Sequence, residues 1–361
     1  MKTLIVIPDF TRKARLKRTL PYVLKKLAGQ GTLRKDIEVI IATGLHRAPT
    51  KKEIKKNLGR IANQIKISVH DYRSVIYFGK TRKGMPVYLN KKIKNADSII
   101  TIGVVEPHLY AGYSGGVKAV SIGLAGEKTI NSTHHPRFLD HPKTKICSIQ
   151  NNIFREFIDE VSTSVPVEYS LNIINGKIIW DSPGKSFKKA VRIAGKIFEK
   201  KINKKFDIII SDVPEEKGIN IYQASRAFNY ILNTKKCALK KHGLVLVKSG
   251  LKEGFGKGIG EKRFKRKIIG MKNPAELIRD VKKRGCLAGE HRAYMVAKAM
   301  KKARLGFISK RAYLYKNNSF PFLFFRNIKE ANNFINIKRD FKKKVEIYYL
   351  KNPFKTILVK N

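Results

Sequence analysis

Short runs of branched apolar residues alternate with helical patterns through the first half of the chain, and this alternation limits the folds that the chain can adopt. Residues 3–8 (TLIVIP), 37–43 (IEVIIAT) and 97–104 (DSIITIGV) have the length and composition of buried strands. Helical patterns at 14–28 and 50–58 lie between them. Strands that alternate with helices favour a doubly wound, mostly parallel sheet.

The strand pattern restarts at residues 206–212 (FDIIISD) and continues at 243–249 (GLVLVKS), with a helical pattern between the two runs. A chain of 361 residues is long enough for two domains. We therefore predict two α/β domains, of which the C-terminal one is smaller. They cover residues 1–204 and 205–332, and a tail at 333–361 carries strands that can pack on either domain, with the N-terminal domain as the expected partner.

The chain is strongly basic, with 77 Lys and Arg residues against 27 Asp and Glu residues and a formal net charge of +50. Such an excess ordinarily indicates an anionic partner such as nucleic acid. Here the basic residues are spread over almost every predicted helix, and the sequence has no zinc-finger, RRM-like aromatic or clear helix-turn-helix motif. We therefore expect a solvated basic surface that steers anionic substrates, and no specific nucleic-acid partner.

The three cysteines, Cys147, Cys237 and Cys286, are far apart and fit neither a disulfide framework nor a CxxC metal site. This usage points to a reducing compartment. The sequence shows no signal-peptide pattern and no apolar run of about 18 residues. We therefore expect a cytoplasmic protein with no membrane partner.

Polar and charged side chains follow each of the first three predicted strands. The carboxyl ends of parallel strands converge on a crevice where ligands bind. If the sheet forms as predicted, His46 and His108 should face one another across a shared cleft. The clustered residues are Asp9, Thr11 and Arg12 in PDFTR, His46 and Arg47 in ATGLHR, and Glu106 and His108 in GVVEPHLY.

A glycine-rich turn, Gly-Tyr-Ser-Gly-Gly, occupies residues 112–116. Its glycines permit close approach of a ligand, and a helix starting near Val117 would offer free N–H groups to a phosphate. The spacing matches neither a P-loop nor GxGxxG. As a phosphate-binding motif the turn is therefore weak on its own.

Lys118 lies in the first turn of that predicted helix, where the helix dipole disfavours a cation. A phosphate contact or a surface position would explain a lysine there, and covalent attachment to a cofactor would remove the conflict by neutralising the charge. His134 and His135 follow, and either can supply one metal ligand. Adjacent histidines normally point in different directions, so they do not form a chelate by themselves.

Taken in order, the segments PDFTR, TGLHR, EPHLYAGYSGGVK, THH and NIYQASRA closely resemble the lactate racemase family, whose members use a nickel-pincer nucleotide. The resemblance covers most of the chain, which is shorter at its N-terminus than the lactate racemases. It implies an isomerase that racemises or epimerises a small 2-hydroxy acid, lactate or a relative, by hydride transfer to and from the cofactor. It also implies maturation proteins that build the cofactor and insert nickel.

The same resemblance implies a role for each matching residue. Lys118 would carry the covalent link to the pyridinium mononucleotide, and His134, selected over His135, would bind nickel. The remaining matches are the acid/base pair His46 and His108, the substrate-binding residues Asp9, Arg12, Gln223 and Arg226, and the cofactor-binding residues Tyr113, Ser114, Gly115 and Gly116 of the turn.

Two positions depart from the family pattern. Arg226 stands where members often have lysine, and a guanidinium can hold a carboxylate through two parallel bonds, so the substrate can differ from lactate. Ile122 stands where a proline is common, a change expected to affect only the turn. The alternatives are a nucleotide-dependent hydroxy-acid dehydrogenase, which lacks support because no GxGxxG follows the first strand, and a basic nucleic-acid-binding protein.

Overall fold

The chain folds into two α/β units. The computed structural model describes residues 1–10, 12–234, 237–315, 320–337 and 345–360, so Thr11 lies outside the described residues. The compact units are Met1–Ile197 and Phe198–Asn361, and the division falls inside α7 (Pro183–Phe198), shortly before the boundary predicted after residue 204. Both main sheets are mostly parallel, which confirms the predicted fold class.

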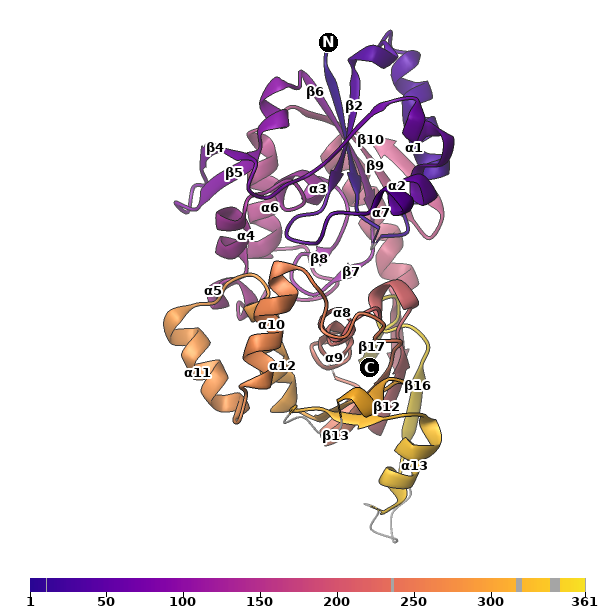
Figure 1. Cartoon of the computed structure of the whole chain (residues 1–361), viewed down its shortest axis with the longest axis vertical. Helices are drawn as coiled ribbons and strands as arrows, with labels where there is room; N and C mark the ends of the chain where they lie inside the picture. The colour runs from indigo at the N-terminus through magenta and orange to yellow at the C-terminus, as the bar shows by residue number, and fades with distance from the viewer. Residues whose placement is uncertain (11, 235–236, 316–319, 338–344, 361) are drawn as a thin grey trace. The chain divides into compact units, whose positions relative to one another are not determined.

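The first unit is built on a six-stranded sheet with the order β10-β9-β6-β1-β2-β3 (Figure 1). All neighbours in it are parallel except the hairpin β9–β10, whose turn residues Asn175 and Gly176 have φ values of 45° and 84°. Positive φ at both positions is the geometry for which the Asn-Gly pair is suited. The strands are β1 (Thr3–Pro8), β2 (Ile37–Ala42), β3 (Lys66–Val69), β6 (Ser98–Val104), β9 (Val167–Ile174) and β10 (Lys177–Asp181).

Helices cover both faces of this sheet (Figure 1). Two small antiparallel pairs, β4–β5 and β7–β8, lie outside it. The small pairs are β4 (Val75–Lys80) with β5 (Pro86–Asn90) and β7 (Pro107–His108) with β8 (Gly112–Tyr113). The helices are α1 (Leu16–Ala28), α2 (Lys51–Leu58), α3 (Lys118–Ser121), α4 (Glu127–Thr133), α5 (Pro136–Leu139), α6 (Ile153–Thr163) and α7. The 3₁₀ turns are Arg34–Asp36, Gly59–Asn63 and Lys91–Asn95.

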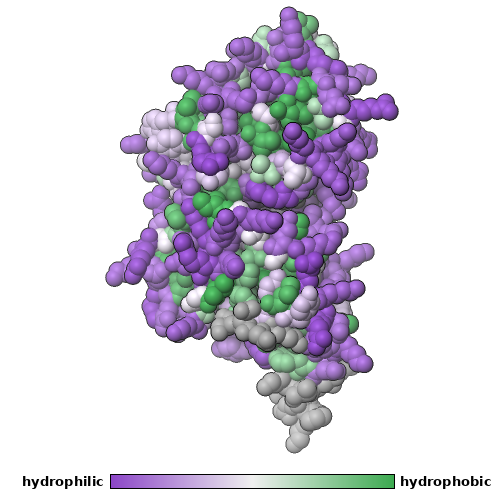
Figure 2. All heavy atoms as spheres, in the orientation of Figure 1, coloured by the Kyte–Doolittle hydropathy of each residue, from purple (hydrophilic) through white to green (hydrophobic). Residues whose placement is uncertain are grey.

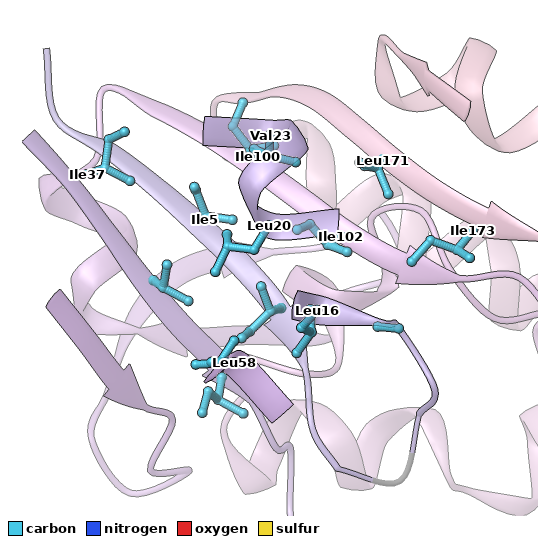
Figure 3. Close-up of a cluster of buried hydrophobic side chains, with 14 of the residues drawn as sticks. Ile5, Leu16, Leu20, Val23, Ile37, Leu58, Ile100, Ile102, Leu171 and Ile173 are labelled. Carbon is cyan, nitrogen blue, oxygen red and sulfur yellow. The ribbon is translucent and has the colours of Figure 1, made fainter. Parts of the chain in front are cut away.

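The core of the first unit forms where α1 packs on the sheet (Figure 3). Leu16, Leu20 and Val23 lie one helical turn apart on the buried face of α1, and they meet every second residue of the strands, such as Ile5 and Ile100. The helix continues through its exposed Pro21. On the opposite face, α3 packs on β1, β6 and α6. The sheet is therefore doubly wound, as the alternating pattern predicts.

The second unit contains a parallel sheet with the order β15-β14-β13-β12-β16 and a separate parallel pair, β11–β17. The strands are β11 (Glu199–Ile202), β12 (Phe206–Asp212), β13 (Leu239–Lys248), β14 (Arg304–Ile308), β15 (Leu323–Phe325), β16 (Ile347–Leu350) and β17 (Ile357–Lys360). The tail strands β16 and β17 pair with β12 and β11, so within the described residues the tail belongs to the second unit and not to the N-terminal domain, where it was expected.

The helix predicted between the strands at 206–212 and 243–249 is divided in the structure into α8 (Ile221–Ala224) and α9 (Arg226–Leu232), which meet at Ser225. Along the part of the chain that the structure describes, no helix is long and apolar enough to cross a membrane. The other helical elements are α10 (Ile259–Ile269), α11 (Pro274–Arg284), α12 (Glu290–Met300) and α13 (Ile328–Ile337), with 3₁₀ turns at Glu215–Lys217 and Ala312–Leu314.

His70, just after β3, is a buried neutral histidine that holds a loop of the first unit. Its Nε2 lies 3.1 Å from the carbonyl oxygen of Ala125, and its Nδ1 lies 2.9 Å from Nδ2 of Asn90. The carbonyl must accept and the amide must donate, so the neutral ring carries its proton on Nε2. Burial lowers the pKa of His70 to about 4. The ring therefore fixes the loop that leads into α4.

We expect this histidine to make the protein sensitive to mild acid. In the unfolded chain, His70 binds a proton near the ordinary histidine pKa of about 6.5. In the folded protein the pKa of His70 is about 4. Between these values the unfolded state binds more protons, so stability falls as the pH is lowered. Between pH 7 and 4.5 the loss from this group is roughly 2.5 kcal/mol.

Urea denaturation at both pH values measures this effect. The variant His70→Asn should be less stable than the wild type at pH 7 but should lose less stability on acidification. The exposed His242 provides the control, because His242→Asn should keep the wild-type dependence. Equal losses in the wild type and in His70→Asn would show that His70 is not the responsible group.

Candidate functional site

Asp9 and His46 form a hydrogen-bonded pair at the ends of neighbouring strands. Asp9 follows β1 and His46 follows β2, and these strands pair in parallel as far as Pro8 and Ala42. Oδ2 of Asp9 lies 2.7 Å from Nδ1 of His46. The Asp9 side chain is 5% exposed and that of His46 is 42% exposed. A buried carboxylate thus orients an imidazole that reaches solvent.

Arg12 and Glu106 form a second pair on the other side of β1. Nη1 of Arg12 lies 3.2 Å from Oε2 of Glu106, and the two side chains are 18% and 7% exposed. Glu106 follows β6, which pairs with β1 in parallel. The structure therefore brings the ends of β2, β1 and β6 together through one hydrogen-bonded pair and one ion pair at one edge of the sheet.

Arg47, the other arginine of the strand-end clusters, has structural contacts. Its guanidinium donates to both carboxylate oxygens of Glu53, at 2.8 and 2.7 Å, and lies 4.3 Å from the centre of the Phe10 ring. The hydrogen bond from Arg47 lowers the pKa of Glu53 to about 2. Glu53 also closes the capping box of α2 with Thr50. These contacts anchor the start of α2 beside the site.

His108 lies in β7, and the following main chain holds its ring. Nδ1 accepts hydrogen bonds from the backbone N–H groups of Tyr110 at 3.3 Å and Ala111 at 3.1 Å. The ring is partly buried. The expectation that His108 faces His46 across a cleft stays a prediction.

An aromatic cluster around Phe154, a buried residue of α6, brings His108 and His134 together. The ring centres of His108 and His134 lie 6.3 and 5.8 Å from that of Phe154. Tyr110 contacts all three rings at 5.7 to 5.9 Å. Sequence reasoning did not identify Phe154 as a site residue, because an apolar residue on an amphipathic helix is ordinarily assigned to the core.

The structure distinguishes the two adjacent histidines after α4. Nδ1 of His134 lies 2.8 Å from the carbonyl oxygen of Ile130, which can only accept, so Nδ1 carries the proton and Nε2 has a lone pair. Nδ1 of His135 instead accepts from the backbone N–H of Arg137 at 3.3 Å, which leaves the proton of a neutral ring on Nε2. Partial burial also lowers the pKa of His135. His134 is therefore the one of the two with a lone pair on Nε2.

A metal-binding histidine usually donates its other N–H to a carbonyl or carboxylate, as His134 does. Among the residues described by the structure, no group of three or more His, Cys, Asp and Glu side chains could hold a metal ion. His134 can therefore fit a metal only where most of the other ligands come with a bound group. This is the arrangement that the predicted nickel nucleotide requires.

The glycine-rich turn is tied to the sheet by hydrogen bonds. The Ser114 hydroxyl donates to the carbonyl of Val104 at 2.7 Å and accepts from the backbone N–H of Glu106 at 3.1 Å. The N–H of Gly116 donates to Oδ1 of Asn172, at 2.7 Å. The turn therefore positions the chain before Lys118, and its polar groups are used within the protein.

Close packing also explains the glycines of this turn. A Cβ on Gly115 would lie 2.7 Å from Cγ2 of Val105, and one on Gly116 would lie 3.1 Å from the Phe187 ring. The helix expected after the turn, α3, has only four residues and begins at the half-buried Lys118. The phosphate-binding role assigned to Tyr113, Ser114, Gly115 and Gly116 stays a prediction.

Gln223 and Arg226 lie in the second unit, at the ends of α8 and α9 that meet at Ser225. Nη1 of Arg226 donates to Oε1 of Gln223 at 3.0 Å, and its guanidinium lies 5.6 Å from the centre of the Phe354 ring. Gln223 is 5% exposed. The two residues form one polar pair, and their role in substrate binding stays a prediction.

The packing of Gly115 predicts a large effect of a small substitution. Gly115 and Gly84 both have positive φ, 90° and 73°, but a Cβ on Gly84 would meet no atom within 4 Å. Gly115→Ala should therefore destabilise the protein by roughly 1–3 kcal/mol more than Gly84→Ala. Urea denaturation of the two variants checks this difference. Equal effects would mean that the turn tolerates a side chain.

Comparison with known proteins extends the similarity beyond the site. Residues 1–146 match the family model of the lactate racemase N-terminal domain. A lactate racemase of Lactiplantibacillus plantarum is 27% identical over 266 residues, 70% of this chain and 61% of that protein. A lactate racemase of Thermoanaerobacterium thermosaccharolyticum is 26% identical over 293 residues, 78% of this chain and 66% of that protein. The match thus spans less than two thirds of either relative.

Two solved structures share the fold. The lactate racemase apoprotein of Thermoanaerobacterium thermosaccharolyticum superposes with a TM-score of 0.85 at 22% identity, over 99% of this chain and 87% of that chain. A protein of Thermotoga maritima gives a TM-score of 0.78 at 16% identity, over 100% of this chain and 94% of that chain. The first 146 residues thus match the lactate racemase N-terminal domain, and over most of its length the chain is similar to lactate racemases.

Proposed function

We propose that the protein is an isomerase that racemises or epimerises a small 2-hydroxy acid, lactate or a related acid. The similarity of residues 1–146 to the lactate racemase N-terminal domain supports this activity. The observation that carries the proposal is the Asp9–His46 pair beside the Arg12–Glu106 pair. The first pair provides a base, and the second provides a cation at the same edge of the sheet. A hydroxy acid needs both, since it presents a hydroxyl proton and a carboxylate.

The chemistry of the substrate determines what the base does. The hydrogen on the α-carbon of a 2-hydroxy acid is too weakly acidic for an imidazole to remove as a proton, whereas the hydroxyl proton can move as that hydrogen leaves with its electron pair. A nickel-pincer nucleotide, when bound, supplies an electron-poor ring that takes up hydride. His46 would accept the hydroxyl proton at Nε2, because Asp9 holds Nδ1.

Lys118 and His134 are the residues that would hold this cofactor. Lys118 follows a turn whose hydrogen bonds to Val104, Glu106 and Asn172 fix the main chain, so its side chain starts from a fixed point. His134 presents Nε2 with a lone pair to a metal. Because the cofactor is not encoded in the chain, maturation proteins that build it are implied partners.

Arg12 would bind the substrate carboxylate, with Glu106 orienting the guanidinium. Asp9, predicted as a substrate-binding residue, is better explained as the residue that orients His46. Gln223 and Arg226 would contact a further polar group of the substrate. A planar guanidinium at residue 226 suits a carboxylate, so an acid larger than lactate belongs among the candidate substrates.

The alternative functions have less support. A dehydrogenase with a dinucleotide would need a phosphate-binding glycine motif after β1, where this chain has PDFTR. Nucleic-acid binding rests on charge alone. Hydrophilic residues cover most of the visible face of the molecule and are not confined to one patch (Figure 2). This distribution fits a generally solvated surface.

Production of the chain together with the cofactor-building enzymes tests the proposal. Intact mass and peptide mapping should show a nucleotide-sized adduct on Lys118, with nickel in equal amount. The preparation should interconvert the enantiomers of a hydroxy acid. An unmodified Lys118 without nickel, under conditions that load a lactate racemase, would contradict the proposal.

The variant His46→Ala separates catalysis from cofactor loading. It should keep the adduct and the nickel but lose racemisation by about 10²–10⁴-fold, the usual contribution of a general base. His242→Ala, at an exposed position, should keep the wild-type rate. Lys118→Ala should lose both the adduct and the activity.

A further inference from the structure

Arg155 in α6 is buried more deeply than its ion pair explains. Its Nε and Nη2 donate to Oδ1 of Asp159, one turn along the helix, at 3.0 and 2.5 Å. The Asp159 side chain is 56% exposed, whereas that of Arg155 is 5% exposed. Nη1 is buried and has no hydrogen-bond partner among the residues that the structure describes. A pair that served only the helix surface would leave both side chains in water, so this burial needs another explanation.

The contact that explains the burial is with Phe187 of α7. The central carbon of the guanidinium lies 3.9 Å from the centre of the Phe187 ring, a distance that places the cation over the face of the ring. The ring also packs on the glycine turn, where a Cβ on Gly116 would lie 3.1 Å from its Cδ2. Phe187 therefore connects Arg155 to Gly116.

Space filling alone does not account for an arginine at this position. Burying a guanidinium with one N–H group unpaired is costly, and an apolar side chain of similar length would fill the same space without that cost. An apolar side chain, however, has no flat cation to lie on the face of a ring. The arginine is therefore best explained by the charged plane that it presents to Phe187.

The same helix is attached to the chain on the other side of Lys118. α3, which begins at Lys118, lies beside α6 (Figure 1). The hydroxyl of Ser121, the last residue of α3, donates to the carbonyl of Ile158 in α6 at 2.6 Å. Gly116 precedes Lys118 by two residues and Ser121 follows it by three. α6 thus holds the main chain on both sides of Lys118, through the Phe187 ring before it and through a hydrogen bond after it.

α6 also contacts His134. The ring centre of Phe154, on this helix, lies 5.8 Å from that of His134. Lys118 and His134 are the residues proposed to hold the cofactor. A group that is joined covalently to one residue and bound through a metal to another fits only where the two residues keep a set separation. A helix that supports both residues is suited to maintain that separation.

We propose, as a refinement that rests on the proposed function, that Arg155 is a positioning residue for attachment of the cofactor. Its guanidinium holds Phe187 against Gly116, and this contact keeps the main chain at the place from which Lys118 reaches the cofactor. Arg155 acts through Phe187 and takes no part in the chemistry. Its loss should loosen the glycine turn and impair attachment, while the rest of the fold and the binding of the substrate stay unchanged.

Amide hydrogen exchange of the apoprotein, measured by NMR, tests the hold on the turn without cofactor or activity. The Gly116 N–H donates to Oδ1 of Asn172, and the fully buried Val6 in the central strand β1 reports on the core. Arg155→Met keeps an apolar side chain of similar length and removes the flat cation. Exchange at Gly116 relative to that at Val6 should become about 10-fold faster, because only the turn is loosened.

Two control variants separate the ring contact from other effects of the substitution. Asp159→Asn retains the guanidinium on Phe187 and should keep the wild-type exchange ratio. Arg304→Met removes an arginine that lies 5.1 Å from the centre of the Phe334 ring in the second unit, and it should also keep that ratio. An unchanged ratio in Arg155→Met would overturn the proposal, since Arg155 would then contribute to overall stability alone.

Loading of the protein tests the consequence for attachment. When it is produced with the cofactor-building enzymes, Arg155→Met should carry the adduct on Lys118 in a fraction about 10-fold smaller than the wild type. The loaded molecules should keep the wild-type KM for the hydroxy acid, because Arg155 acts on the tether and not on the substrate. Wild-type loading of Arg155→Met would contradict the positioning role. A wild type that stays unloaded under conditions that load a lactate racemase would refute the proposed function, and the exchange ratio would still decide whether Arg155 holds the turn.

Discussion

The central position of β1 is the constraint on which the site depends. β1 pairs in parallel with β2 on one side and with β6 on the other, so the three strands end at the same edge of the sheet. The residues after β1 reach the segments on both sides, Asp9 to His46 and Arg12 to Glu106. If one of these strands paired elsewhere, the residues that now form these two pairs would be far apart.

The glycine turn fixes the main chain before Lys118. A glycine-rich loop is commonly interpreted as space left for a ligand, but here the missing Cβ atoms are where Val105 and Phe187 pack. The side chains of Ser114 and Asn172 satisfy polar groups of the same segment. A fixed main chain suits a lysine whose Nζ must be placed reproducibly, because each rotamer of the long side chain then puts Nζ at a defined position.

Local patterns predicted much of the fold. Branched apolar runs located β1, β2 and β6, because this signal depends on neighbouring residues. The break at Ser225 and the pairing of the tail strands were not predicted, because they depend on contacts distant in sequence. The motifs identified candidate site residues, but the Phe154 cluster and the proton positions on the histidines required the folded arrangement.

Asn172 connects the glycine turn to the segment that leads out of the first unit. This fully buried amide accepts from the N–H of Gly116 through Oδ1 and donates to the Ser186 hydroxyl in α7 through Nδ2. Ser186 in turn donates to the carbonyl of Ile179 in β10. Only an uncharged side chain with an acceptor on one branch and a donor on the other can join both. Aspartate at this position would keep the shape of the side chain but could not donate to the Ser186 hydroxyl, so half of the connection would be lost.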